Sequence, residues 1–365
     1  MARKISKKRK ISRRVAVGAV AVTAAAGIGL SALPASAATG PSWSSAGPAD
    51  VSGTVSAVTS VQFGFGTTAE WAFVTTAYLT NFKGYPSVYS RTDNGSWAKA
   101  TLPGSAPGEV FVSATAINND DVLAFSTLPN NTGREWQFNG HTWRVIKAFT
   151  APIGGASVTS ASNVWVFGSP NPGTPHLGVY HYNGRAWTKV ASTLDGGQGL
   201  SDGTAWAYTG GTVAHYNGKV WTGTNLAGLI PGSSPRIVDV YDTDGTMYAV
   251  GEGVVSKTEQ SIAVLIYNGH TWARVPGQII AAAVVPNQIS SDGDGGVWFP
   301  LIGATPHGSA AVVHYTRSVK KLSVTDLPGG ILSITRVDLT FELAGGSVSS
   351  GKTNPASYAE LEYYN

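Results

Sequence analysis

The sequence predicts an all-β chain that folds as a seven-bladed β-propeller with four-stranded antiparallel blades; six or eight blades are the alternatives. A unit of Tyr or Phe, Asn, Gly, two variable residues and Trp recurs at residues 138–143, 182–187, 216–221 and 267–272. The copies close segments of about 40 residues, which is the length of a propeller blade. The composition agrees, because 45 Gly, 11 Trp and only 13% charged residues suit many short strands joined by tight turns.

The repeated unit reads as a β-hairpin. Asn-Gly favours a type I′ turn, in which both central residues have positive φ. With Asn and Gly at the centre, the Tyr would pair with the residue after Gly, and the Trp with the residue two before the Tyr. Trp187 would then lie opposite Tyr180, and Trp272 opposite Leu265. Such cross-strand pairs indicate one hairpin face built for burial.

The blades divide the chain into consecutive segments. We expect them at about 52–104, 105–150, 153–192, 196–231, 232–277, 278–327 and from 329 onward. The last segment stops at Tyr364-Asn365, before a fourth strand. Residues 40–43 read Gly-Pro-Ser-Trp, which would complete the unit after Tyr364-Asn365. We therefore predict that the N-terminal strand closes the last blade, although the predicted register places Trp43 opposite Glu362.

These repeats resemble kelch-type repeats and those of related secreted bacterial, actinobacterial-type propellers. The resemblance rests on glycines after the second strand, such as Gly168 and Gly251, on the Tyr of the third strand and on the Trp of the fourth. Blades 1 and 2 lack the glycine, and the Tyr-to-Trp spacing is shorter than in typical kelch units. The resemblance implies a propeller with ligand-facing loops, and it implies no particular ligand.

The first 37 residues have the pattern of a secretory signal peptide. Residues 1–14 contain eight Lys or Arg, residues 15–33 are uncharged and rich in Ala, Val and Gly, and Ala35-Ser36-Ala37 is a small-residue cleavage site. We expect cleavage after Ala37, with Sec or twin-arginine export and a retained membrane anchor as the competing interpretation. The propeller domain would then be residues 38–365, secreted, extracellular and free of the membrane.

Charge and cysteine content exclude several classes of function. Removing the eight basic residues from the total of 25 leaves 17 against 21 acidic ones, a net charge of −4, so a nucleic-acid partner is not expected. There is no cysteine, which excludes disulfides and Cys-based metal sites. Asp292-Gly293-Asp294 is faintly typical of a calcium loop, but a turn is the better interpretation. We expect no metal, no cofactor and a monomer.

The candidate site residues lie in the loops between second and third strands, which vary most from blade to blade. The loop at 76–87 offers Tyr78, Asn81, Phe82, Lys83 and Tyr85. Exposed aromatic rings beside amides suit carbohydrate or protein contacts. Covering of the blade edge is the competing interpretation for Phe82 and Tyr85.

Two further candidates are His176 and His307, each of which follows Thr-Pro in such a loop. The tryptophans could be sugar-stacking platforms, but their repetition favours inter-blade core. The acidic residues lie mostly in turns, whereas a glycosidase needs two converging carboxyls. We therefore predict a non-catalytic binding protein whose partner is a glycan or an extracellular protein. The alternative is a carbohydrate-active enzyme, a hydrolase or lyase, with its site at the channel mouth.

Overall fold

The computed structural model describes the backbone of most of the chain after residue 42. The described residues are 43–45, 54–63, 67–75, 83–93, 95–169, 175–277, 279–284, 289–302, 311–326, 330–336, 342–349 and 357–364. All of them belong to one compact unit, Pro41–Asn365. No helix among these residues is long and apolar enough to cross a membrane. The predicted signal peptide lies outside the described residues and stays a prediction.

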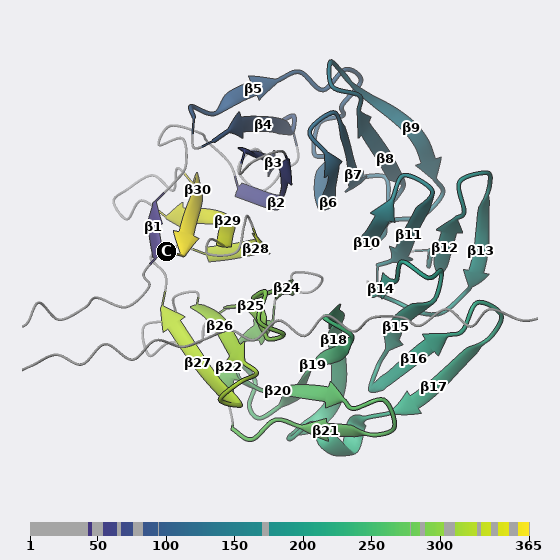
Figure 1. The fold of residues 1–365 in the computed structure, drawn as a ribbon, viewed down its shortest axis with the longest axis vertical. Coiled ribbons are helices and arrows are strands. Elements are labelled where there is room, and N and C mark those ends of the chain that lie inside the picture. The colour runs from purple at the N-terminus through teal and green to yellow at the C-terminus, as the bar shows by residue number, and fades with distance from the viewer. Residues whose placement is uncertain are drawn as a thin grey trace, which may run out of the picture. The chain divides into compact units, whose positions relative to one another are not determined.

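The described strands form seven antiparallel sheets, each with a four-stranded path, set around a common centre (Figure 1). We number the sheets in chain order and give each from its innermost strand outward. Sheet 1 is β2 (Thr54–Phe63), β3 (Thr67–Thr75), β4 (Ser87–Thr92) and β5 (Ala98–Ala100). Sheet 2 is β6 (Val110–Asn118), β7 (Asp121–Thr127), β8 (Gly133–Phe138) and β9 (Trp143–Phe149). Sheet 3 is β10 (Ile153–Ser160), β11 (Asn163–Gly168), β12 (Val179–Tyr182) and β13 (Trp187–Ala191).

The remaining sheets follow the same order. Sheet 4 is β14 (Gly197–Gly199), β15 (Ala205–Thr209), β16 (Thr212–Tyr216) and β17 (Trp221–Asn225), followed by a short 3-10 helix, η1 (Ala227–Leu229). Sheet 5 is β18 (Ser233–Thr243), β19 (Thr246–Val254), β20 (Gln260–Tyr267) and β21 (Trp272–Arg274), and β22 (Ile279–Ala281) also pairs with β20. Sheet 6 is β23 (Ala283–Val284), β25 (Val297–Ile302), β26 (Ala311–Thr316) and β27 (Lys321–Asp326), and β24 (Ser290–Ser291) also pairs with β25. Sheet 7 is β28 (Gly330–Arg336), β29 (Glu342–Ser349), β30 (Ser357–Tyr364) and the N-terminal β1 (Trp43–Ser45).

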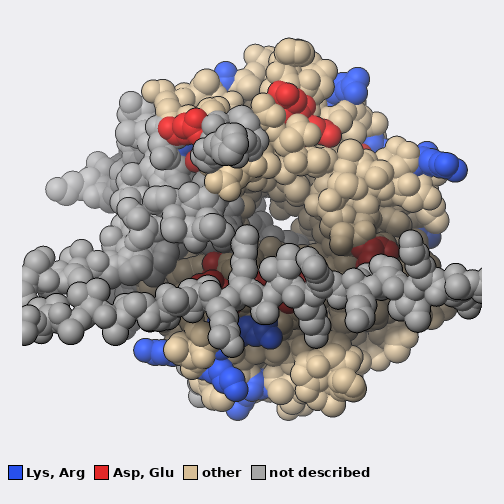
Figure 2. Space-filling model, in the orientation of Figure 1, with Lys and Arg blue, Asp and Glu red and all other residues tan. Residues whose placement is uncertain are grey.

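Burial changes from the centre of each sheet to its edge. The second strands β7, β11 and β25 are almost continuously buried, because both of their faces pack against neighbouring sheets. The fourth strands β13 and β17 contain no buried residue, and β17 is mostly exposed. Lys and Arg side chains lie around the outside of the visible face, which is hollowed at its centre (Figure 2). Charged edge strands resist pairing with other chains.

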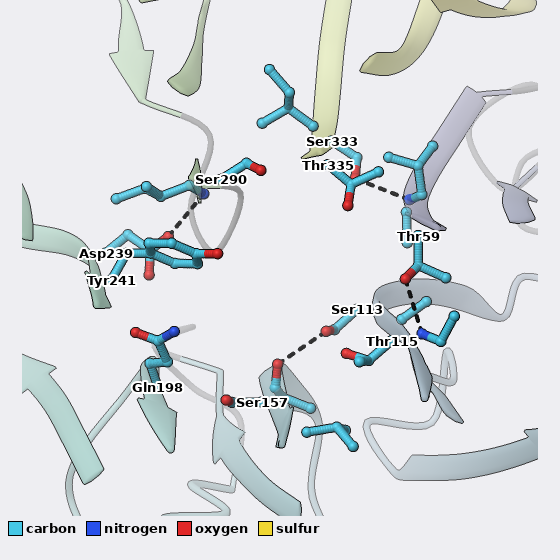
Figure 3. A pocket seen from close by; sticks show the side chains of 18 of the residues that line it. Thr59, Ser113, Thr115, Ser157, Gln198, Asp239, Tyr241, Ser290, Ser333 and Thr335 are labelled. Carbon is cyan, nitrogen blue, oxygen red and sulfur yellow. Dashed lines mark hydrogen bonds between the residues drawn. The ribbon is translucent and has the colours of Figure 1, made fainter. Parts of the chain in front are cut away.

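The innermost strands of six of the sheets, together with β24 and the preceding Ile289 of sheet 6, line a central cavity of about 310 Å³. Its wall carries many small hydroxyl side chains (Figure 3). Several lining side chains bond to the backbone of the next sheet. Ser333 Oγ accepts from Val58 N, Thr59 Oγ1 accepts from Ala116 N, Ser113 Oγ donates to Ala156 O, Ser157 Oγ donates to Gly199 O, and Asp239 Oδ2 accepts from Ile289 N. The polar lining therefore ties neighbouring sheets together and satisfies buried backbone groups.

The hairpin of the repeated unit exists, but its predicted register was wrong. The Trp pairs directly with the Tyr or Phe, as in Tyr182↔Trp187 and Tyr267↔Trp272. The predicted pairs Trp187–Tyr180 and Trp272–Leu265 do not form. Asn268 N donates to Thr271 O at 3.2 Å, so the two central residues of the turn are Gly269 and His270. Of these two, only Gly269 has a positive φ, at 91°.

The asparagine side chain explains this shift of the turn. Asn268 Oδ1 accepts from the backbone N–H groups of His270 and Thr271, at 2.9 and 2.8 Å. Asparagine commonly bonds in this way to the backbone two residues on. The residue therefore stays outside the turn centre with ordinary φ, and Gly takes the first central position, which is where a type II′ turn requires it.

The closure by the N-terminal strand is confirmed at the level of backbone pairing. β1 pairs antiparallel with β30, with Trp43 opposite Tyr364 and Ser45 opposite Glu362. This is the same Tyr-opposite-Trp register as in the other units. The expected mismatch of Trp43 with Glu362 followed from the wrong turn position and disappears with it. The architecture is an all-β propeller with four-stranded antiparallel blades.

Candidate functional site

The predicted loop site is only partly within the described residues. Tyr78, Asn81, Phe82 and His307 lie outside them, so their roles stay predictions. Lys83 is exposed, and Tyr85 is 59% exposed. The structure brings neither of these two side chains into a described cavity.

His176 is held by its own loop and by the next sheet. Gly178 N donates to His176 Nδ1 at 3.0 Å, and His176 Nε2 lies 2.7 Å from Asp195 Oδ1. Because Nδ1 accepts, Nε2 carries the proton and donates to the carboxylate. Both ring nitrogens are thus occupied. His176 thus links the loop after β11 to the segment before β14, and a binding role for it stays a prediction.

The acidic candidates are also used internally. Asp292 Oδ1 accepts from Asp294 N and Gly296 N, and its Oδ2 accepts from His314 Nε2 at 2.9 Å. The described residues contain no group of three or more His or acidic side chains that could hold a metal ion. Among the described residues that line the central cavity, Asp239 is the only carboxylate.

A pair of stacked rings recurs in three sheets. A second-strand Trp lies opposite a third-strand His in Trp165↔His181, Trp206↔His215 and Trp298↔His314. The ring centroids of the first and third pairs are 4.0 and 3.8 Å apart with nearly parallel planes. Trp165 is 0% exposed and Trp298 3% exposed. These two pairs are core.

The pair in sheet 4 departs from this pattern. Trp206 is only half-buried, and its ring is tilted 31° from that of His215. Trp165 Nε1 donates to Asn163 Oδ1 at 2.9 Å, whereas the matching position in sheet 4 is Thr204. Among the described residues, none accepts from Trp206 Nε1.

Residues of sheet 5 face the Trp206–His215 pair from the other side of the interface between sheets 4 and 5. Trp206 makes edge contacts with Tyr267 and Trp272, at centroid distances of 5.4 and 5.8 Å. In the preceding interface Trp221 Nε1 donates to Val190 O at 3.0 Å, which draws sheets 3 and 4 together. Trp272 holds the matching place in sheet 5, but no described residue accepts from its Nε1. The interface between sheets 4 and 5 is therefore left open at this level.

The opening is a cavity of about 630 Å³, which we call the aromatic groove. It lies between the outer strands β17 and β21, which are neighbours in the ring (Figure 1). Its aromatic lining is Trp206, His215, Tyr267, His270 and Trp272, and its other lining side chains are Thr222, Thr224, Asn225, Leu226, Leu229 and Thr271. This mixture of aromatic walls with a few polar groups is typical of small-ligand sites.

The electrostatics of the groove favour a neutral ligand. The described lining contains no Asp, Glu, Lys or Arg. Burial lowers the pKa of His215, with a smaller opposing effect from Asp202. The imidazole is therefore mostly neutral at pH 7. Asn225 offers a donor to the groove, because its Oδ1 already accepts from Ala227 N at 2.9 Å and its amide NH2 remains.

The repetition of the tryptophans favoured inter-blade core over sugar-stacking platforms, and the sequence-based prediction therefore missed the groove. A signal was present at two positions. Thr204 replaces the asparagine that binds the indole in sheet 3, and Asn225, the last residue of β17, leads through Leu226 into a 3-10 turn. Neither position could be interpreted before the inter-sheet packing was known.

Comparison with known proteins supports the fold alone. No protein-family model and no curated protein matches the chain. The solved structure of YCF48 bound to a D1 peptide is similar over 92% of this chain and 100% of its own, with a TM-score of 0.58 and 10% identity. The extracellular domain of the B. thetaiotaomicron one component system BT4673 is similar over 88% of this chain and 40% of its own, with a TM-score of 0.55 and 13% identity. The WD40 β-propeller domain of Doa1 is similar over 88% of this chain and 96% of its own, with a TM-score of 0.51 and 11% identity.

Proposed function

We propose that the chain is a secreted, non-catalytic carbohydrate-binding β-propeller whose ligand lies in the aromatic groove between sheets 4 and 5. One observation carries the proposal: a Trp–His pair that is core in two other sheets is uncovered here and faces a cavity. Trp206 and Trp272 present ring surfaces for the apolar face of a sugar. Their indole N–H groups, with Asn225, can donate to sugar oxygens.

Binding fits the groove better than hydrolysis does. A glycosidase needs two carboxyls on either side of the scissile bond. The described groove lining has no carboxylate, and the described lining of the central cavity has one, Asp239. Secretion is supported by the pattern of residues 1–37, and an extracellular glycan is a partner that such a protein would meet.

A glycan array followed by calorimetric titration tests the proposal. Trp272→Ala should weaken binding by about 2 kcal/mol or more, roughly 30-fold, because it removes a central aromatic wall. Trp187→Ala is the matched control. Trp187 is also a half-buried Trp of a fourth strand, and it lies outside the groove. The centroid of its ring lies 5.4 Å from that of Tyr182 and 5.3 Å from that of Phe149.

The two variants separate binding from folding. Both should lose stability, but only Trp272→Ala should lose the ligand. Equal affinity in the wild type and Trp272→Ala would place the ligand elsewhere. Cleavage of an array glycan by the purified protein would favour the enzyme alternative.

A further inference from the structure

We propose that the aromatic groove selects sugars that carry an acetamido group, the N-acetylhexosamines. This inference rests on the proposed function and specifies its ligand. An acetamido group is a carbonyl acceptor beside a methyl group. Its recognition therefore needs hydrogen-bond donors next to apolar side chains, and the groove has both.

The donors come from both walls. Trp206 Nε1 and Trp272 Nε1 donate to no described residue, and both side chains line the groove. The bond from Ala227 N to Asn225 Oδ1 orients the amide, so that Asn225 presents its NH2 group as the free donor. Three such donors suit a ligand rich in carbonyl and hydroxyl oxygens.

The apolar part lies next to Asn225 in the chain. Leu226 and Leu229 line the same cavity, and η1 brings them together through Leu229 N donating to Leu226 O at 2.9 Å. The turn is fixed to sheet 4, because Leu226 N donates to Gly211 O at 2.8 Å. Leu226 is only 2% exposed and anchors the turn in the core, so the half-buried Leu229 offers the apolar surface. An amide donor and this leucine side chain on one rigid turn are suited to a carbonyl and its methyl group.

The lack of charged side chains in the described groove lining further restricts the class of sugar that can bind. A uronic or sialic acid would bring a carboxylate into a cavity whose described lining has no Lys or Arg to pair with it. Burying an unpaired charge is unfavourable. A plain hexose would leave Leu229 and part of the donor set unused. The neutral acetamido sugar uses all three features.

The test compares chitotriose with cellotriose, which have the same linkage and length and differ in the acetamido group. Calorimetric titration of the full mature protein should show chitotriose binding about tenfold more tightly, which corresponds to about 1.4 kcal/mol. Asn225→Asp keeps the acceptor for Ala227 N but replaces the donor by a carboxylate oxygen. It should reduce chitotriose affinity about tenfold and leave cellotriose affinity within about twofold.

Asn130→Asp is the control for the charge change. Asn130 Oδ1 also accepts from a backbone N–H two residues on, that of Thr132, and Asn130 lies in the loop between β7 and β8 of sheet 2, outside the groove lining. This variant should bind both sugars as the wild type does. Thermal melts of all variants verify folding.

The outcomes distinguish this inference from the proposed function. Equal affinity for the two trisaccharides, or unchanged selectivity in Asn225→Asp, would overturn the acetamido assignment while carbohydrate binding in the groove stands. Failure of chitotriose, cellotriose and every array glycan to bind would overturn both. Trp272-dependent binding of a decaproline peptide without any sugar binding would also overturn both and assign the groove to a peptide.

Discussion

Glu135 should make the stability of the propeller depend on pH in an unusual direction. It lies in β8 between Phe125 of β7 and Lys147 of β9, and it is only 3% exposed. Among the described residues, no donor is bonded to its carboxylate. Burial raises its pKa from 4.5 to about 7, and the charge of Lys147 offsets part of this rise.

The magnitude follows from the two pKa values. A raised pKa means that the folded protein holds this proton more tightly than the unfolded chain does. The free energy of unfolding therefore falls as pH rises from 4.5 through about 7, and the full loss is present above that pH. A difference of two to three pH units corresponds to about 3 kcal/mol.

The substitution Glu135→Gln keeps the shape and removes the ionisation. At pH 8 the variant should be more stable than the wild type by about 3 kcal/mol, and at pH 4 the two should be nearly equal. Urea titrations at both pH values measure this difference, and all other titrating groups cancel in the comparison. Parallel pH profiles for the two proteins would show that Glu135 ionises normally and would refute the reasoning.

Two further predictions concern closure and acid stability. Removing residues 1–45 should lower the free energy of unfolding by roughly 2–4 kcal/mol relative to removing residues 1–40, because β1 completes sheet 7; equal melting temperatures would show that the strand contributes nothing. Burial also lowers the pKa of His181 and His215 below 6.5. The unfolded chain therefore takes up more protons than the folded protein when the pH drops below 6.5, and the free energy of unfolding of the Glu135→Gln variant should fall. Urea titrations should show a shallower fall in His181→Gln, and an unchanged slope would contradict the assignment.

The repeated hairpins carried most of the fold prediction. Local signals sufficed for this, because Asn-Gly, Tyr and Trp act within six residues, and their repetition implies sheets that need neighbours. The same local signals misplaced the turn by one residue. The side chain of Asn268 bonds to two backbone N–H groups, and a rule based on dipeptide preference does not contain that contact.

The site was less accessible to sequence reasoning. His176 looked distinctive because its loop is irregular, yet Asp195 and Gly178 occupy both of its nitrogens. Trp206 looked ordinary because it repeats, yet its indole lacks the partner that Asn163 gives to Trp165. Residue type and spacing alone did not distinguish these two situations.

By itself the sequence determined the antiparallel sheets and the aromatic hairpins, because these depend on short-range turn chemistry and on apolar periodicity. It also determined the return of the N-terminal strand to the last sheet, because residues 40–43 complete the repeat unit that begins at Tyr364. Only the tertiary structure decided which tryptophans are core and which face a cavity. That difference depends on how two neighbouring sheets meet. Sheets 3 and 4 are joined by a bond from Trp221 to Val190, whereas among the described residues no such bond joins Trp272 to sheet 4, and the groove lies at this second interface.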